Sequence, residues 1–282
     1  MIRICSDSTC DLSREIIERY GITIIPLHIL LGDKEYRDGE DITQKEIFEW
    51  ADANKATPKT SAVSFTDASA AVKPMADAGD EIILFTISSF FSTTNNVFNM
   101  VAEDLEAADR IHIVDSMNLS TGIGLLVVEA AEMASEGYSA EEILKEIERL
   151  KPKVRSSFVV DTLTYLQRGG RCSSIAALTG GVLRIHPKII VKDGKMEVSK
   201  KYRGQIKNVV MDYAKDMHYA LLGARRQRVF VTHTCQDREL VEEVKSYLDS
   251  LGYFEEILET QAGGVISSHC GPGTLGVLFI EG

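Results

Sequence analysis

The sequence lacks the features that would assign it to several common classes. Its five cysteines are odd in number and include no Cys-x-x-Cys pair, so neither a disulfide framework nor a zinc site is indicated. No apolar run is long enough to cross a membrane, and the first residues lack the apolar stretch of a secretory signal. A formal charge of -11 argues against nucleic acid, whose phosphates would be repelled. We therefore expect a cytoplasmic protein with reduced thiols, no metal and no stable membrane insertion.

The signatures of common catalytic sites are also missing. There is no Gly-x-x-x-x-Gly-Lys-Ser/Thr nucleotide loop, and Gly122 and Gly124 begin a Gly-x-Gly that no third glycine completes. Neither His-Glu-x-x-His nor a Gly-x-Ser-x-Gly elbow occurs. The sequence therefore predicts a binding site without catalytic machinery or a cofactor of its own.

What is present is the composition of a globular chain, with 44% hydrophobic and 26% charged residues. In the first half, short apolar strands alternate with helices, and two of the helices begin with the Thr/Ser-x-x-Glu spacing of a capping box. The strands are expected at residues 2–5, 22–31 (interrupted by Pro26), 81–88 and 110–116. The helices are expected from Ser13 to Gly21, from Thr43, and at residues 93–105, 119–135 and 140–151. This alternation predicts a parallel sheet covered on both faces.

The pattern changes after the Lys-Pro-Lys junction at residues 151–153. Asp193-Gly194 between residues 189–191 and 195–200 predicts a β-hairpin. Further strands are expected at 229–234, 255–260 and 276–280, with helices at 205–222 and 237–251. The predicted fold is therefore α/β with two domains. Residues 1–152 would form a three-layer α/β/α domain with a mainly parallel sheet, and residues 153–282 an α/β domain with a mixed sheet.

Four stretches of the first half are rich in hydroxyl groups, at residues 7–9, 60–64, 88–94 and 115–122. A single serine or threonine before a helix is usually only an N-cap. Because ligands of open α/β sheets bind beyond the carboxyl ends of the strands, we expect these stretches to converge. Hydroxyls and helix N-terminal amides together suit a carboxylate or a small polar group.

The second half adds basic groups. Arg168-Gly169-Gly170-Arg171 contains a double glycine that would let the backbone approach a ligand closely, and residues 200–204 close the hairpin with Lys-Lys-Tyr-Arg-Gly. Residues 269–273 are expected to form a rigid turn that carries His269. Each also has a plainer interpretation, as a solvated basic turn or a hydrogen-bonded loop histidine.

Taken together, these motifs resemble the DegV family, in order along the whole chain. The resemblance rests on Asp7-Ser8, Thr60-Ser61, Ser88-Ser89 with Ser92-x-Thr94, Val114-Asp115-Ser116, Asp161-Thr162-Leu163, Arg168-Gly169-Gly170-Arg171, Arg203-Gly204 and His269-x-Gly271-Pro272-Gly273. Two positions depart from the family pattern. Val63 stands where proline is usual, and Thr93 stands where glycine is usual. A β-branched residue does not readily take glycine-only backbone angles.

The resemblance implies a protein that binds a long-chain fatty acid, such as palmitate, stearate or oleate. It implies that the carboxylate is presented to the ATP-binding protein of a separate fatty acid kinase, which forms an acyl-phosphate for phospholipid synthesis. Carried over by position, Thr60 and Ser92 would bind the carboxylate, with Ser61 and His269 adjacent. Arg171 and Arg203 would lie near the portal, facing the phosphoryl group or the partner.

Two alternatives remain open. The chain could be a phosphotransferase related to dihydroxyacetone kinases, for which His269 is the only candidate for covalent attachment of a substrate. It could instead be a lipid-responsive regulatory protein. A fold-level analogy is a weak argument for the former.

Overall fold

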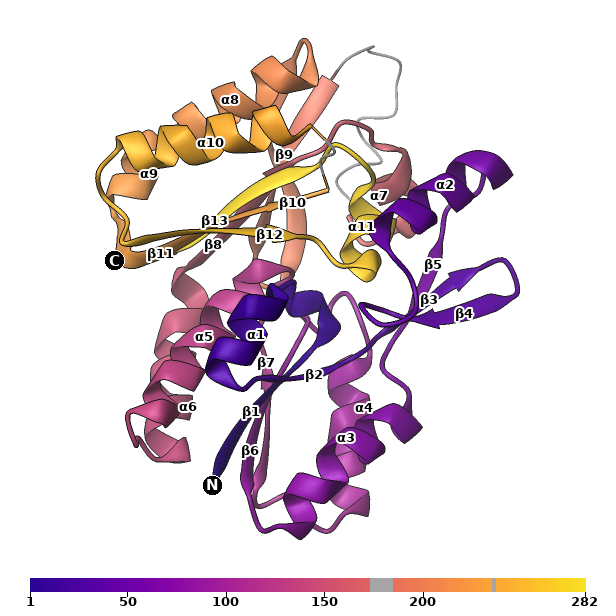
Figure 1. Cartoon of the computed structure of the whole chain (residues 1–282), viewed down its shortest axis with the longest axis vertical. Coiled ribbons are helices and arrows are strands. Elements are labelled where there is room, and N and C mark those ends of the chain that lie inside the picture. The colour runs from indigo at the N-terminus through magenta and orange to yellow at the C-terminus, as the bar shows by residue number, and fades with distance from the viewer. Residues whose placement is uncertain (173–184, 235–236) are drawn as a thin grey trace.

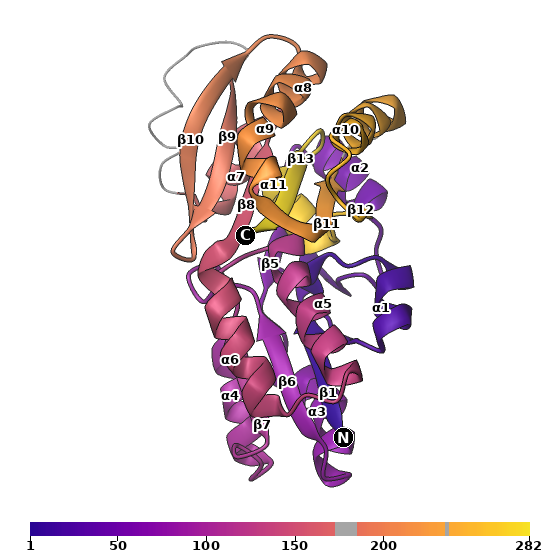
Figure 2. The ribbon, with the colours of Figure 1, turned by 90° about the vertical axis from the view of Figure 1, so that its left-hand side faces the viewer.

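The computed structural model describes residues 1–172, 185–234 and 237–282, and these form an α/β fold (Figures 1 and 2). The predicted combination of one parallel and one mixed sheet is confirmed. Within the described residues, no helix has both the length and the apolar character needed to cross a bilayer. Cys5, Cys10 and Cys270 are buried, and Cys235 lies outside the described residues.

The first sheet has the strand order β2-β1-β6-β7, and all its pairs are parallel. Its strands are β1 (Ile2–Asp7), β2 (Thr23–Ile25), β6 (Glu81–Thr86) and β7 (Ile111–Asp115). Successive side chains of β6 face opposite ways, so Ile83 and Phe85 pack into one core while Ile82 and Leu84 pack into another. The first core includes α1 (Arg14–Tyr20), α5 (Thr121–Ser135) and α6 (Ala140–Leu150), and the second includes α3 (Phe65–Asp77) and α4 (Thr94–Asp104). This is the predicted three-layer arrangement.

The predicted helix ends are confirmed by their hydrogen bonds. Ser13 caps α1, which ends at Gly21 in the left-handed region with φ 63°. Thr43 and Glu46 form the capping box of α2 (Gln44–Asn54). Ser139 and Glu142 form that of α6. The helix α3 was not predicted.

The expectation of one strand over residues 22–31 was wrong. β2 joins the parallel sheet, whereas β3 (His28–Leu31) pairs with β4 (Lys34–Arg37) and β5 (Lys59–Ser61) in a separate antiparallel sheet. Pro26, between the two strands, has a fixed φ and no N–H to donate to a ladder, so the chain changes direction there. This break places Thr60 and Ser61 on a strand of the small sheet.

The second large sheet has the order β10-β9-β8-β13-β11-β12 and is mixed, because only β11 and β12 run parallel. Its strands are β8 (Val154–Val159), β9 (Ile185–Lys192), β10 (Lys195–Arg203), β11 (Ala224–His233), β12 (Glu256–Gln261) and β13 (Leu275–Glu281). The predicted hairpin forms, with positive φ at both Asp193 and Gly194, and its strands are longer than expected. β8 was not predicted.

The helices α8 (Ile206–Asp216), α9 (His218–Leu222) and α10 (Arg238–Ser250) lie over one face of this sheet (Figure 1). The single helix expected over residues 205–222 is two helices, because Met217 has φ −90° and ψ 4° and leaves the helical region. Two further short helices, α7 (Thr164–Gly169) and α11 (Gly264–Cys270), follow β8 and β12, and α11 carries His269 while Arg171 comes just after α7.

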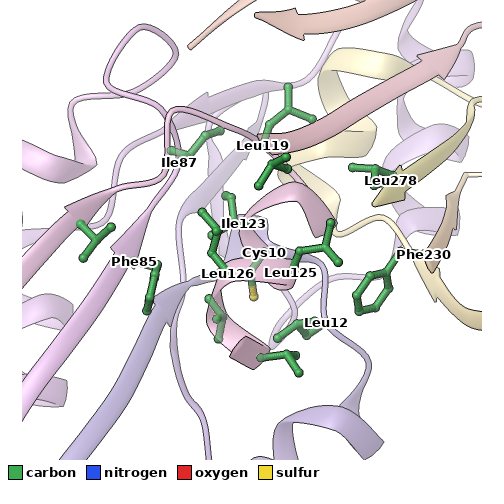
Figure 3. Close-up of a cluster of buried hydrophobic side chains, with 14 of the residues drawn as sticks. Cys10, Leu12, Phe85, Ile87, Leu119, Ile123, Leu125, Leu126, Phe230 and Leu278 are labelled. Atoms are coloured by element: carbon green, nitrogen blue, oxygen red, sulfur yellow. The ribbon is translucent and has the colours of Figure 1, made fainter. Parts of the chain in front are cut away.

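The helix α5 joins the two halves, because both sheets pack against it. Ile123 and Leu125 of α5 lie in one cluster with Phe85 of the first sheet and with Phe230 and Leu278 of the second (Figure 3). The change of sheet falls at residues 151–153, next to the boundary expected at residue 152. Because this largest core spans both halves, the division into two domains stays a prediction.

Candidate functional site

A cavity of about 550 Å³ lies where the small sheet, the segment after β6 and the helix α11 meet. We call it the hydroxyl cavity. Five of the six predicted site residues line it, namely Thr60, Ser61, Ser92, His269 and Arg171. The sixth, Arg203, is the exposed last residue of β10 and is not among the lining residues. Sequence reasoning therefore brought together five side chains from four separate segments.

Thr60 and His269 are in direct contact, with 2.8 Å between Thr60 Oγ1 and His269 Nε2. Burial, with a smaller effect from the charge of Arg171, lowers the pKa of His269 to about 4. The imidazole is therefore neutral at pH 7. If Nε2 carries the ring proton, it donates to Thr60 and leaves the hydroxyl hydrogen of Thr60 to point at a ligand. His269 Nδ1 is buried without a hydrogen-bond partner among the described residues.

His269 lies on the helix α11 and not in the turn that the sequence predicted. The double glycine Gly169-Gly170 explains the position of His269. A Cβ atom on Gly169 would lie 2.4 Å from His269 Nδ1, so only glycine permits this approach, while Gly170 ends α7 with φ 67°. The expected close approach of backbone to ligand is thus an approach of backbone to the site histidine. Gly271 packs in the same way, since a Cβ there would lie 2.5 Å from the ring of Tyr165.

Arg171 stands at the rim of the hydroxyl cavity. Its Nη1 donates to the carbonyl oxygen of Gly169 at 2.7 Å, and its side chain is exposed. It is the only lysine or arginine among the residues that line this cavity in the described part of the chain.

Ser92 is fixed by a small network that also holds the segment after β5. Its hydroxyl lies 2.8 Å from Thr94 Oγ1 and accepts the Thr94 N–H at 3.2 Å. The N–H of Val63 donates to the same threonine oxygen at 3.4 Å, a bond that proline could not make. Thr93 has φ −85°, which any residue can adopt, so the expected strain at this position is absent. Both departures from the family pattern are therefore compatible with the site.

The hydroxyl groups of the stretches at residues 7–9 and 115–122 do not line the cavity, so the expected convergence of all four stretches was wrong. Ser8 donates to Asp38 at 2.8 Å, and Ser120 donates to Asp11. Ser88 Oγ donates to the carbonyl oxygen of Gly194 at 2.8 Å. These hydroxyls satisfy buried acceptors behind the site instead of facing a ligand.

Sequence reasoning missed the buried aspartates that hold the site in place. Asp11 accepts the N–H of Gly263 at 2.8 Å and Asp38 accepts that of Gly264 at 2.7 Å, so both anchor the start of α11. Asp7 accepts the N–H of Ile87 at 2.7 Å, just before the segment that carries Ser92. A usable signal was the Gly263-Gly264 pair. A Cβ on Gly264 would lie 2.4 Å from Ile29 Cδ1, and such a pair marks a close backbone approach.

The carboxyl groups of Asp7, Asp11 and Asp38 are all buried, and burial changes their pKa values. Burial raises the pKa of Asp7 to about 6 and raises those of Asp11 and Asp38, although their hydrogen bonds act in the opposite direction. None of the salt bridges of the described residues includes them. The buried residues behind the hydroxyl cavity are therefore acidic, and no described lysine or arginine forms a salt bridge with them.

The rest of the lining of the hydroxyl cavity is mainly apolar and includes Leu27, Ile87, Leu119, Val265 and Ile266. A void of about 20 Å³ shares Leu119 and Ile266 and extends between Phe158 and Leu278. Ligand sites typically occupy about 300–1,000 Å³ and combine apolar walls with a few polar groups. Within the described residues, no cluster of three or more His, Cys, Asp or Glu side chains could hold a metal ion.

Comparison with known proteins gives consistent matches over the whole length. The model of the family described as "Uncharacterised protein, DegV family" matches residues 1–282. A DegV domain-containing protein of Caldanaerobacter subterraneus subsp. tengcongensis is 33% identical over 282 residues, 99% of each chain. A structure reported as fatty acid binding of a DegV family protein from Thermus thermophilus matches with a TM-score of 0.91 at 32% identity, covering 99% of each chain. A stearic acid-binding protein from Eubacterium ventriosum matches at 31% identity and a TM-score of 0.85, covering 100% of this chain and 98% of the other.

Proposed function

The chain belongs to the DegV family, and on that premise we propose that it binds one long-chain fatty acid in the hydroxyl cavity. The carboxylate lies at Thr60, Ser61, Ser92 and His269, and the acyl chain lies against the apolar walls. The observation that carries this proposal is the 2.8 Å contact between Thr60 and His269 in a cavity whose lining is mainly apolar. Two related proteins of at least 31% identity are reported to bind fatty acids.

The chemistry of the cavity suits an acyl chain with one polar end. Burial contributes about 0.8 kcal/mol per methylene, so a long tail supplies most of the affinity. A carboxylate taken out of water needs fixed hydrogen-bond donors, which the hydroxyls of Thr60, Ser61 and Ser92 provide.

A direct test is to extract the purified protein with organic solvent and identify the lipid by mass spectrometry. We expect close to one fatty acid per chain, because so large an apolar contact survives purification. If extracts contain none, and delipidated protein cannot be loaded with palmitate, stearate or oleate, the proposal fails. The variant Lys73→Gln, on the exposed face of α3, serves as a control that should retain the lipid.

We further propose that this protein is a carrier without ATP chemistry of its own, and that a separate fatty acid kinase phosphorylates the bound carboxylate. Phosphoryl transfer depends mainly on positioning and on neutralising charge around the moving group. Arginine suits that task because its planar fork grips phosphate oxygens. Arg171 at the rim and the exposed Arg203 are the residues proposed to face the phosphoryl group or the kinase.

The second test pairs two measurements for Arg171→Ala and Arg203→Ala in an assay reconstituted with the kinase. Both variants should retain the fatty acid and lose most acyl-phosphate formation. Full turnover in both would remove the arginines from this role. Phosphorylation of the fatty acid by the wild-type protein with ATP and magnesium alone would favour the phosphotransferase alternative.

A further inference from the structure

A second cavity, of about 650 Å³, opens on the other side of the Asp193–Gly194 turn. It lies where the hairpin diverges from β8. The β8–β9 pairing covers only Ser157–Val159 of β8, whereas Val154–Ser156 pair with β13 alone in the described part of the chain. The cavity occupies this gap. It is also lined by Met217, which follows α8, and by Ala220 of α9. We call it the lysine cavity.

The charge of the lysine cavity is opposite in sign to that of the whole chain. Four basic side chains line it, Lys151, Arg155, Lys188 and Lys192, against the two acidic side chains of Glu148 and Asp193. The cavity therefore has an excess of two positive charges in a protein with a formal charge of -11. Such a local reversal concentrates anions at the site.

Counting Glu281 as well, because it pairs with Arg155, reduces the excess to one, and the two cations left without a salt bridge among the described residues are Lys188 and Lys192. Lys151 is paired with Glu148 at 2.8 Å, and Arg155 is paired with Glu281. Among the described residues, neither Lys188 nor Lys192 has a carboxylate within salt-bridge distance. The ammonium group of Lys188 lies over the ring of Tyr213, 5.4 Å from its centre, and burial lowers its pKa. A half-buried cation of this kind gains when an anion replaces the water it has lost.

One further observation supports a ligand site. Val154, Ile190, Met217 and Phe279 supply an apolar surface beside the lysines.

We propose that the lysine cavity binds an amphipathic phosphate monoester, with its phosphate at Lys188 and Lys192 and its apolar group against Ile190, Met217 and Phe279. A phosphate monoester carries about −1.5 to −2 charges at pH 7 and can accept hydrogen bonds from both lysines, which no carboxylate of the described residues pairs. This site is separate from the proposed fatty acid site, and neither proposal depends on the other.

Residues around the two cavities are in contact, so the test must tell the cavities apart. Gly194 lines the lysine cavity and accepts a hydrogen bond from Ser88, while Lys195 lies over the ring of Phe90, which lines the hydroxyl cavity. Hexyl phosphate is therefore titrated into the full chain, and two-dimensional amide NMR follows residues of both cavities. Hexanoate and inorganic phosphate are the comparison probes.

We expect hexyl phosphate to shift the amide signals of Ser157, Met217 and Ala220, and to bind more tightly than either comparison probe. Lys188→Gln should weaken binding about tenfold, as for the loss of one charged hydrogen bond. Ala220→Phe, which fills the cavity from an exposed position on α9, should do the same with little effect on folding. The matched lysine variant Lys73→Gln should bind as the wild type does.

Two results would overturn the inference. One is the absence of saturable binding of hexyl phosphate to the wild-type protein. The other is binding that persists in both Lys188→Gln and Ala220→Phe but disappears in Thr60→Val, since the probe would then occupy the hydroxyl cavity.

Discussion

The hydroxyl cavity and the lysine cavity lie on either side of one β-turn and offer an anion different surroundings. In the hydroxyl cavity the polar groups are neutral hydroxyls and a neutral histidine, with one exposed arginine at the rim. Behind it lie three buried carboxyl groups that form no salt bridge with any described residue. In the lysine cavity two lysines lack a carboxylate partner among the described residues. An anion would be held by hydrogen bonds in the first cavity and by charge in the second.

The difference shows how one fold can keep two anionic ligands apart. Hydrogen bonds from neutral donors depend on geometry and are insensitive to salt, whereas attraction between exposed charges is screened within about 10 Å at 0.1 M salt. A site without cations needs a long apolar tail to reach high affinity. A site with cations can select the charge of the head group, and the four predictions below test this contrast.

The largest effect is expected from Gly169→Ala. The new methyl group would meet His269 Nδ1 at 2.4 Å and displace the ring from Thr60, so fatty acid affinity should fall roughly 100-fold through loss of two polar contacts. Gly170→Ala is the matched control, because it meets nothing within 4 Å but is strained at φ 67°. The control should lower stability by about 1 kcal/mol and leave affinity intact. Equal affinities in the two variants would contradict this account of the histidine.

The next effect is expected from Thr60→Val, which keeps the shape of the side chain and removes its hydroxyl. Fatty acid binding should weaken roughly 10- to 100-fold, corresponding to about 1.5–3 kcal/mol for a hydrogen bond to a charged group. Thr60→Ser should restore most of the affinity. Calorimetric titration of delipidated protein measures both. Lys188→Gln should not change this affinity, and a comparable loss there would break the contrast between the cavities.

A smaller effect concerns the buried carboxyl groups. Because the pKa of Asp7 is raised from 3.8 to about 6, its contribution to stability is complete below pH 3.8 and is lost as the pH rises through 6. Lowering the pH from 7 to 5 should therefore add roughly 1 kcal/mol to the free energy of unfolding through Asp7. Asp11, Asp38 and the Cys10 thiol are the titratable groups that act on it.

The measurement compares urea unfolding of the wild type and Asp7→Asn at both pH values. His269 acts in the opposite direction, since its lowered pKa costs stability as the pH falls below 6.5. The prediction therefore concerns the stability of the wild type relative to Asp7→Asn, which should rise by roughly 1 kcal/mol between pH 7 and pH 5. A difference that does not change with pH would show that Asp7 keeps its charge.

The smallest expected effect is that of salt on the affinity of the hydroxyl cavity for a fatty acid. Comparing it with the effect of salt on the lysine cavity tests the difference between the two cavities most directly. Raising the ionic strength from about 0.05 to 0.5 M should weaken hexyl phosphate binding several-fold, because screening acts on the lysines. The affinity for a fatty acid should change less than about twofold. Titrations at four salt concentrations provide both slopes. A similar slope for the two ligands would mean that Arg171 or another cation dominates the hydroxyl cavity.

Local sequence was a good guide wherever the decisive interactions are local. The caps at Ser13, Thr43 and Ser139 and the turn at Asp193-Gly194 are confirmed, because each depends on a few neighbouring residues. The interruption at Pro26 was visible in the sequence, but the passage of the chain from one sheet to another there was not. The break at Met217, within a long helical pattern, was not predicted.

In the candidate site, too, the local features were predicted and the long-range contacts were not. The chemistry of its side chains was visible in the sequence, and Thr60, Ser61, Ser92, His269 and Arg171 line one cavity. Their roles, and that of Arg203, stay predictions. Asp11 and Asp38 were not predicted to support the site, because their hydrogen bonds to α11 span more than 200 residues of chain.

The sequence by itself determined the alternation of strands and helices in the first half, the predicted caps, the hairpin and the hydroxyl-rich character of the site. Only the tertiary structure decided that His269 lies against Thr60, 209 residues earlier in the chain. That contact depends on Gly169 letting α7 and α11 approach, and on Asp11 and Asp38 anchoring the far end of α11. The lysine cavity likewise exists only because the hairpin leaves β8. Local propensity acts over a few residues, whereas such contacts arise from packing of the whole chain.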